Sequence, residues 1–211
     1  MQNMRIALFL YEGLTTLDII GPHDVLSRLP EAEAISVGRT TGPFMADTGV
    51  LGLTATHTID QVDEADILVV PGGVDGTFTA AADEKIQEWV RMIDANSLWT
   101  TSVCTGPLIL GSAGVLNGKR ATSHWAAVEA LEGFGATPVS DERVVIDGKY
   151  VTAAGVSAGI DMALTLAARV AGDDVAKTIQ LGIEYDPQPP FDSGSADKAG
   201  PEIAALAAGI F

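Results

Sequence analysis

The stretch LWTTSVCTGPLILGSAGVL, residues 98–116, predicts a strand, a sharp turn and a helix in immediate succession. Residues 98–103 are mostly β-branched or aromatic, which favours a strand. Gly106 and Pro107 then open an apolar run, with the proline in the first helical turn, where its missing N–H does no harm. Cys104, the only cysteine of the 211 residues, occupies the turn between them. A strand that passes directly into a helix is the repeating unit of an α/β fold.

The rest of the chain alternates between short apolar strands and helices in the same way. ADILVVPGG (65–73) is a near-continuous Val/Ile/Leu run, typical of a strand buried on both faces of a parallel sheet. RVVIDGKYVTAAG (143–155) predicts a hairpin with Asp147 and Gly148 at its turn. Further strands are expected at 5–11, 34–40 and 119–125, and helices at 14–29, 83–95, 126–135, 157–172 and 173–185. This order predicts an α/β fold with a doubly wound, mostly parallel sheet sandwiched by helices.

Three segments depart from this alternation. Residues 43–59 mix turn residues with short β runs, which favours a hairpin or an excursion at the sheet edge. DPQPPFDSGSADKAGP (186–201) is rich in Pro, Gly, Ser and Asp and predicts an irregular arm, and residues 202–211 fit a short helix. With no internal repeat and no interior linker, we expect a single domain over residues 1–211, with the arm starting near residue 186.

Composition and charge exclude several classes of protein. Hydrophobic residues make up 47% of the chain and charged residues 19%, which is enough apolar material for a full core. The formal net charge of −16 repels phosphate backbones and anionic lipids, so we expect no nucleic-acid and no membrane partner. No apolar stretch approaches the roughly 20 residues that span a bilayer, and the N-terminus resembles a strand rather than a signal peptide. We therefore expect a cytoplasmic protein that acts on a small molecule.

Residues that bind metals and cofactors are sparse. One cysteine allows neither an internal disulfide nor a zinc site built from cysteines. His23, His57 and His124 lack the spacing of metal ligands, and neither a GxGxxG nor a GxxxxGK[ST] motif is present. The prediction is therefore no metal and no cofactor.

Cys104 meets the local requirements of a nucleophile elbow. Such a turn needs small residues two positions before and two positions after the nucleophile, and Ser102 and Gly106 supply them. A thiol at a helix N-terminus feels the positive end of the helix dipole, which is expected to lower the pKa of Cys104. The alternative is an inert buried thiol, because free cysteine is among the most buried residue types.

Asp18 is the candidate acid–base partner. It follows the first strand and is flanked by Leu17, Ile19 and Ile20, so we expect it to be partly desolvated. The carboxyl ends of parallel strands share one sheet edge, which places Asp18 and Cys104 on the same side. A carboxyl group hydrogen-bonded to the thiol then serves as acid or base, whereas the alternative is an aspartate that caps its helix.

Several other residues are candidates for the surroundings of Cys104. The N–H groups of Gly73 and Thr105 are candidate donors to developing charge, although an ordinary glycine turn explains the Pro-Gly-Gly sequence equally well. His124 and Trp125 follow the fifth strand and either line the site or serve the core. The candidate pocket residues are Gly72, His124, Trp125 and Val156.

Taken together, these motifs resemble the ThiJ/PfpI superfamily, the single-domain relatives of class I glutamine amidotransferases. The resemblance runs through LTTLDIIGPHDVL, ILVVPGG, TTSVCTGPLILGSAGVLNGKRATSHW, AAGVSAGIDMALTLAA and QLGIEYDPQPPFDSGS, which together cover nearly the whole chain. It implies a flavodoxin-like fold. Ala153-Ala154-Gly155 departs from the glycine run that the family often has at this place.

Within the superfamily the chain is most similar to the isonitrile hydratases, on its LDxxGP, Cys-Thr-Gly, Ser-His-Trp and Pro-Pro-Phe-Asp segments. This implies addition of water to an isonitrile, R–NC, to give an N-substituted formamide through a thioimidate on Cys104, with Asp18 as acid and base. Thr105 stands where PfpI-type proteases have a catalytic histidine, which disfavours proteolysis. The resemblance also implies a homodimer, and the irregular arm suits contact with a neighbouring subunit.

Three other functions stay open on the sequence. A cysteine-based redox sensor or protective protein uses an oxidisable thiol at the same place. A glyoxalase-type hydratase of the same superfamily shares the fold and the cysteine. A ligand-sensing domain of a transcription regulator is the third, although the chain has no basic helix-turn-helix segment.

Overall fold

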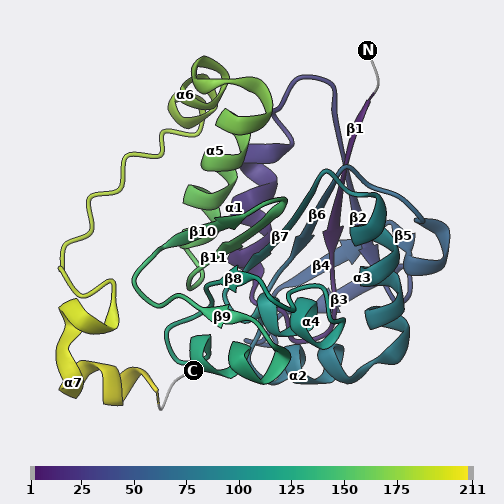
Figure 1. Ribbon diagram of the computed structural model, residues 1–211. Coiled ribbons are helices and arrows are strands. Elements are labelled where there is room, and N and C mark those ends of the chain that lie inside the picture. Colours follow the sequence, from purple (N-terminus) through teal and green to yellow (C-terminus); the bar gives the residue numbers. More distant parts are fainter. Residues whose placement is uncertain (1–2, 209–211) are drawn as a thin grey trace.

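The computed structural model describes residues 3–208 and places a mostly parallel sheet between two layers of helices (Figure 1). Within these residues the main sheet has seven strands in the order β10-β11-β7-β6-β1-β2-β5. Neighbouring strands are parallel except for β10 and β11. The strands are β1 (Met4–Phe9), β2 (Ala32–Gly38), β5 (His57–Thr58), β6 (Ile67–Val70), β7 (Trp99–Val103), β10 (Val144–Asp147) and β11 (Tyr150–Ala153). The predicted doubly wound, mostly parallel sheet is confirmed.

Helices cover both faces of this sheet. On one face α1 packs against α5, which in turn packs against α6, and on the other α4 contacts both α2 and α3 (Figure 1). The helices are α1 (Thr16–Leu26), α2 (Asp75–Ala82), α3 (Glu84–Asn96), α4 (Gly106–Ser112), α5 (Ala158–Ala171) and α6 (Asp173–Gly182). The connection from β1 leads outward to β2, whereas the connection from β6 leads to β7 on the other side. The switch point, where ligands bind in open α/β sheets, therefore lies between β1 and β6.

The central strands are buried as their composition predicts. All four residues of β6, Ile67–Val70, are fully inaccessible to solvent. Burial of one such branched side chain stabilises the fold by about 1.5–3 kcal/mol. On the α3 side, the Trp89 ring packs against Phe9 of β1 with ring centroids 5.2 Å apart and a tilt of 38°, and its indole N–H donates to Val62 O at 2.8 Å. The carboxyl ends of β1, β6 and β7 are thus anchored in this core.

Two small sheets lie outside the main one. The excursion predicted between residues 43 and 59 contains an antiparallel hairpin, followed by β5 and a single 3₁₀ turn, η1 (Ile59–Gln61). The strand predicted at 119–125 is only two residues long and pairs outside the main sheet. The small sheets are β3 (Gly42–Met45) with β4 (Gly52–Ala55), and β8 (Arg120–Ala121) with β9 (Thr137–Pro138).

Three local predictions were wrong. The helix expected at 126–135 is the 3₁₀ segment η2 (Val128–Phe134), which ends at Gly135 with φ +75°. Helix α2 was not predicted, because it buries mainly small or polar residues such as Thr77 and Ala80 and has no regular apolar face. The β10–β11 turn lies at Gly148 and Lys149, one residue later than expected, because Asp147 still pairs with Tyr150. Positive φ at Gly148 suits this tighter position.

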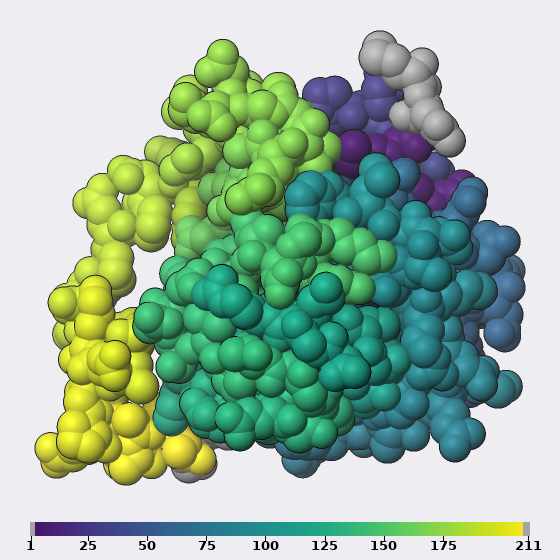
Figure 2. Space-filling model, in the orientation of Figure 1, coloured from purple at the N-terminus to yellow at the C-terminus, as the bar shows by residue number. Residues whose placement is uncertain are grey.

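The C-terminal region stands away from the body of the molecule. Residues 186–195 form no helix or strand, as predicted, and Figure 2 shows an opening between this segment and the rest of the surface. Helix α7 (Ala196–Ala207) begins earlier than expected, because the Ser195 hydroxyl accepts from Lys198 N and caps it, and a kink follows at Gly200 (φ +77°). No residue of α7 is buried. Its large apolar side chains Ile203 and Leu206 are exposed.

Among residues 3–208, no helix combines the length and the apolar character that crossing a membrane requires.

Candidate active site

Four strand ends meet at the switch point. Asp18 follows β1, the Pro-Gly-Gly loop follows β6, Cys104 follows β7, and Ala154 and the residues after it follow β11. The loops are tied directly to one another, since Thr15 N donates to Gly72 O at 2.8 Å and Cys104 N donates to Ala154 O at 3.0 Å. The structure therefore brings the two predicted catalytic residues to one edge of the sheet.

Cys104 occupies a strained elbow. Its φ is +59°, in the left-handed region that non-glycine residues rarely adopt. A side chain at Gly106 would put its Cβ 2.3 Å from Val70 O, and one at Gly72 would lie 2.5 Å from Thr105 N. The turn at Cys104 is as tight as expected at Gly106, and Gly72 is required by the same close approach. Strain of this kind costs about 1–3 kcal/mol and is typical of functional sites.

The carbonyl of Cys104 is held from the β8 side. Ser123 Oγ donates to Cys104 O at 2.6 Å, and the main-chain N–H of His124 donates to the same oxygen at 2.9 Å. Ser123 was not among the predicted site residues, and its only signal in the sequence was its place beside His124. These two donors fix the orientation of the elbow.

Asp18 is fully buried, and no cationic group of residues 3–208 pairs with it. Its Oδ2 accepts from Gly72 N at 2.8 Å, whereas Oδ1 is buried and makes no regular hydrogen bond within the described residues. Its side chain does not cap α1, which excludes the capping alternative. Burial raises the pKa of Asp18 to about 7, while the Gly72 N–H and the Cys104 thiol act in the opposite direction. The predicted desolvation of this carboxyl is confirmed.

The expectation of a lowered thiol pKa was wrong. Burial, together with the negative charge of Asp18, raises the pKa of Cys104 to about 12, against the N–H groups of Val156 and Thr105, which lower it. Desolvation outweighs the start of α4, a helix of only seven residues. Because thiol and carboxyl interact, the first proton lost near pH 7 belongs to the pair rather than to Asp18 alone.

The predicted backbone donors behave differently from one another. The Thr105 N–H lowers the pKa of the thiol, whereas the Gly73 N–H donates to Thr105 Oγ1 at 3.0 Å and is already occupied. The N–H of Val156, predicted only as pocket lining, also reaches the thiol. Val156 has φ +31°, so the second donor also sits on strained backbone. The available donors around Cys104 are therefore Thr105 and Val156.

A buried chain of hydroxyl groups lies behind the elbow. Tyr11 Oη donates to Pro71 O at 3.0 Å and lies 3.1 Å from Thr77 Oγ1, which lies 2.8 Å from Thr105 Oγ1. Sequence analysis missed Tyr11 and Thr77, because Tyr11 looked like the end of a strand and Thr77 belongs to the helix that was not predicted. Burial holds the pKa of Tyr11 well above its usual value, so the phenol is protonated.

A pocket of about 560 Å³ adjoins the elbow. It contains three of the four predicted pocket residues, His124, Trp125 and Val156, whereas Gly72 lies on the Asp18 side. The rings of His124 and Trp125 are 5.4 Å apart, and burial lowers the pKa of His124. Arg143 also lines the pocket, but its guanidinium is bound to Asp161 and Ser157. The arm contributes residues 194–197 to the pocket rim.

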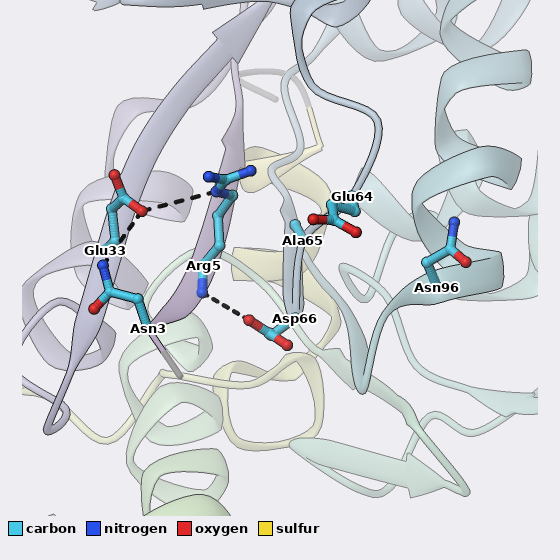
Figure 3. Close-up of a pocket in the computed structure, with 7 residues that line it drawn as sticks. All are labelled: Asn3, Arg5, Glu33, Glu64, Ala65, Asp66 and Asn96. Carbon is cyan, nitrogen blue, oxygen red and sulfur yellow. Dashed lines mark hydrogen bonds and ion pairs between the residues drawn. The ribbon is translucent and has the colours of Figure 1, made fainter. Parts of the chain in front are cut away.

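A second cavity, of about 270 Å³, lies at the opposite edge of the sheet (Figure 3). It is polar, with Arg5 N donating to Asp66 Oδ2 at 2.8 Å and the Arg5 guanidinium 3.8 Å from Glu33. These residues stand at the amino ends of the strands, where α/β sheets do not bind their ligands. Within residues 3–208, no group of three or more His, Cys, Asp or Glu side chains is arranged to hold a metal ion.

Comparison with known proteins places the chain in a family. Residues 4–169 match the model of the DJ-1/PfpI family. Isonitrile hydratase from Pseudomonas putida is 45% identical over 196 residues, which span 93% of this chain and 85% of that protein. A crystal structure of a ThiJ/PfpI family protein from Pseudomonas syringae, 38% identical, superimposes with a TM-score of 0.95 over 100% of this chain and 86% of that one.

A more distant structure shows the fold alone. DJ-1beta from Drosophila melanogaster, at 22% identity, has a TM-score of 0.79 over 88% of this chain and 100% of its own. The match to the family model and the 45% identity extend over most of the chain, including both Asp18 and Cys104 in the residues matched by the model. The chain therefore belongs to the DJ-1/PfpI family.

Proposed function

We propose that this protein is a cofactor-independent isonitrile hydratase, which adds water to R–NC and releases an N-substituted formamide. The observation that carries the proposal is the fully buried Asp18 carboxyl with its raised pKa beside Cys104 at a strained elbow. A carboxyl that changes protonation near neutral pH suits both proton delivery and proton removal. The 45% identity to a protein named isonitrile hydratase supports the choice of substrate class.

The first step forms a covalent bond to sulfur. Once the pair has lost one proton, the remaining proton sits on either partner, and the reactive form has a Cys104 thiolate and a protonated Asp18. The thiolate attacks the terminal carbon of the isonitrile, and the lone pair on that carbon takes the proton of Asp18. The product is a thioimidate, R–N=CH–S–Cys104, and an ionised Asp18.

The second step consumes water and restores the enzyme. Asp18 accepts a proton from a water whose oxygen adds to the thioimidate carbon, and the same proton passes to the nitrogen. The hydroxyl proton of the tetrahedral adduct then returns to Asp18 as the C–S bond breaks. The formamide R–NH–CHO leaves, and thiolate and protonated carboxyl are regenerated. Asp18 Oδ1 has no regular hydrogen bond, so its lone pairs are available to accept the proton of the water and later that of the adduct hydroxyl.

Two backbone donors are placed to support the negative charge on sulfur. The N–H groups of Thr105 and Val156 both lower the pKa of Cys104, so they favour thiolate as attacking and as leaving group. Gly73, whose N–H is bound to Thr105, serves the elbow rather than the substrate. The substituent R fits the pocket that Trp125, His124 and Val156 line.

A redox sensor is less well supported. Sensor cysteines are exposed thiols with a lowered pKa. Cys104 is buried, with only 7% of its surface exposed, and its pKa is raised. We therefore favour catalysis over sensing.

As part of the same proposal, the enzyme is a cytoplasmic homodimer that acts on a small molecule. Support for the dimer comes from α7, which exposes Ile203 and Leu206 and buries none of its residues in the single chain.

The test is formamide production from a simple aryl isonitrile by wild type, Cys104→Ala and Asp24→Asn. Cys104→Ala should abolish product, and acid-quenched wild type should show an adduct equal in mass to the isonitrile. Asp24→Asn removes an exposed carboxylate of the same helix that pairs with Arg28, and should keep wild-type rates. Turnover by Cys104→Ala would rule out the covalent route. Methylglyoxal in the same assay tests the glyoxalase-type alternative.

A further inference from the structure

Two buried hydroxyl side chains near the site have no part in the mechanism above. Tyr11 is 3% exposed and Thr77 is fully buried. Thr77 Oγ1 donates to Gly73 O at 2.6 Å, and Thr105 Oγ1 has one proton to give either to the same carbonyl, 2.9 Å away, or to Thr77 Oγ1, 2.8 Å away. The single proton of Tyr11 Oη goes either to Pro71 O at 3.0 Å or to Thr77 Oγ1 at 3.1 Å, and we call the three adjacent side chains Tyr11, Thr77 and Thr105 the hydroxyl chain.

The hydroxyl chain holds the loop that binds Asp18. Gly72 lies between Pro71 and Gly73, whose carbonyls accept from Tyr11 and from Thr77 respectively. The Gly73 N–H is also bound, to Thr105 Oγ1 at 3.0 Å. The residues on both sides of Gly72 are therefore fixed, and the Gly72 N–H points at Asp18 Oδ2, at 2.8 Å.

The same chain ends on the residue that follows the nucleophile. Thr105 presents its N–H to the Cys104 thiol, while its side chain is held by Gly73 and Thr77. One end of the hydroxyl chain thus fixes the donor to the carboxyl and the other end fixes the donor to the thiol. Strand β1, helix α2 and the elbow after β7 are joined through it.

We propose that Tyr11 and Thr77 are positioning residues, whose hydroxyl chain sets the placement of the Asp18 carboxyl relative to the Cys104 thiol. Neither residue touches the reacting atoms. The test of this role by enzyme activity rests on the proposed isonitrile hydration, whereas a second test, by alkylation of Cys104, does not. Small displacements of reacting groups cost large factors in rate, so positioning at this range acts mainly on kcat.

Loss of the hydroxyl chain should change the pKa of Asp18 in a definite direction. The charged or titratable groups that act on Asp18 are Cys104 of the elbow and Asp47 of the β3–β4 turn, and the Tyr11 phenol lies near the same pair. The Gly72 N–H favours the ionised carboxyl, so a loosened loop raises the pKa of Asp18 further. The pH at which the pair loses its first proton should therefore move upward.

The experiment compares Thr77→Val and Tyr11→Phe with wild type and with Thr77→Ser, which keeps the hydroxyl. We expect kcat for an aryl isonitrile to fall roughly tenfold or more in the first two, with KM changed less than about twofold. The acid limb of the kcat/KM profile should shift upward by roughly 0.5–1 pH unit. Thr77→Ser should stay close to wild type in both measurements.

Alkylation of Cys104 by iodoacetamide between about pH 5 and 9 provides the second readout, because it follows the same first proton without any isonitrile. Its midpoint should shift in the same direction in both variants. If wild type turns over no isonitrile but the alkylation midpoint still shifts, the proposed function fails and the positioning role stands.

The matched control is Thr101→Val, which removes another fully buried threonine hydroxyl, bound to Leu68 O at 2.9 Å within the sheet. It should lower stability without moving either pH midpoint. Unshifted midpoints in folded Thr77→Val and Tyr11→Phe, or an equal shift in Thr101→Val, would overturn the inference.

Discussion

The two edges of the sheet each contain a buried aspartate, in opposite circumstances. At the amino edge Asp94 is bound by Lys149 at 3.2 Å, by Thr100 Oγ1 at 2.7 Å and by Tyr150 Oη at 3.3 Å. At the carboxyl edge Asp18 has one backbone donor, a thiol neighbour and, in the part of the chain that the structure describes, no cation. The first carboxylate is satisfied and ties β7 to β11, whereas the second is left with its charge uncompensated.

This difference teaches how one residue type serves structure at one edge and chemistry at the other. A carboxylate surrounded by a cation and hydroxyl donors serves structure, because loss of one partner from such a buried group is destabilising. A desolvated carboxyl without a cation gains a proton near neutral pH, which is what acid–base catalysis needs. The carboxylates of the cavity at the amino edge (Figure 3) are likewise partnered, because Arg5 lies close to both Asp66 and Glu33.

The largest effect is expected for Asp18→Asn. The amide keeps the volume and an acceptor for the Gly72 N–H but neither delivers nor accepts the catalytic proton. We expect kcat/KM for an aryl isonitrile to fall by roughly 10²–10⁴-fold with the fold intact. Steady-state rates together with circular dichroism check this, and near-normal rates would assign the proton chemistry to another group.

The same variant should change how stability depends on pH. The pKa of Asp18 is raised by folding from 3.8 to about 7, so its contribution to stability is fully present below about pH 4 and is lost as the pH rises through about 7. Asparagine does not titrate, so Asp18→Asn should gain stability relative to wild type by up to about 3 kcal/mol between about pH 5 and 8. Urea unfolding of both proteins at about pH 5 and about pH 8 measures this. A difference in unfolding free energy that is the same at both pH values would show that the carboxyl is not desolvated.

Asp94→Asn should show the converse behaviour. It weakens the bonds to Lys149, Thr100 and Tyr150, so we expect a loss of about 2 kcal/mol in the free energy of unfolding at neutral pH. The rate on isonitriles should stay within about twofold of wild type, because Asp94 lies at the far edge of the sheet. A large loss of kcat in the folded variant would break the division between the two edges.

The wild-type enzyme should itself depend on pH. Below the first proton loss of the pair both groups are protonated and no thiolate forms, so kcat/KM should fall about tenfold per pH unit below about pH 7. A profile measured from about pH 5 to 9 tests this, with a stable plateau at low pH as the contradicting outcome. The upper limit, set by the thiol pKa of about 12, lies beyond this range.

Much of the fold followed from local patterns. The apolar run at 65–73, the hairpin around Gly148 and the elbow residues Ser102 and Gly106 each carry their own signal, because burial, turn chemistry and close approach restrict residue type. Helix α2 had no such signal, since it lacks an apolar face. The helical pattern at 126–135 predicted an α-helix, but the segment is interrupted by glycine and forms the 3₁₀ segment η2. The early start of α7 depends on a single serine cap.

By itself, the sequence determined the chemistry available: one thiol at a strand-to-helix turn, and one aspartate among apolar residues. Only the tertiary structure decided how that chemistry is tuned. It placed Cys104 beside Asp18 in a desolvated site and so raised the thiol pKa that the helix start alone would lower. It also bound the Gly73 N–H to Thr105 Oγ1 and brought Tyr11, Thr77 and Thr105 together behind the elbow. Burial and hydrogen-bond partners arise from segments far apart in the chain, so no local pattern records them.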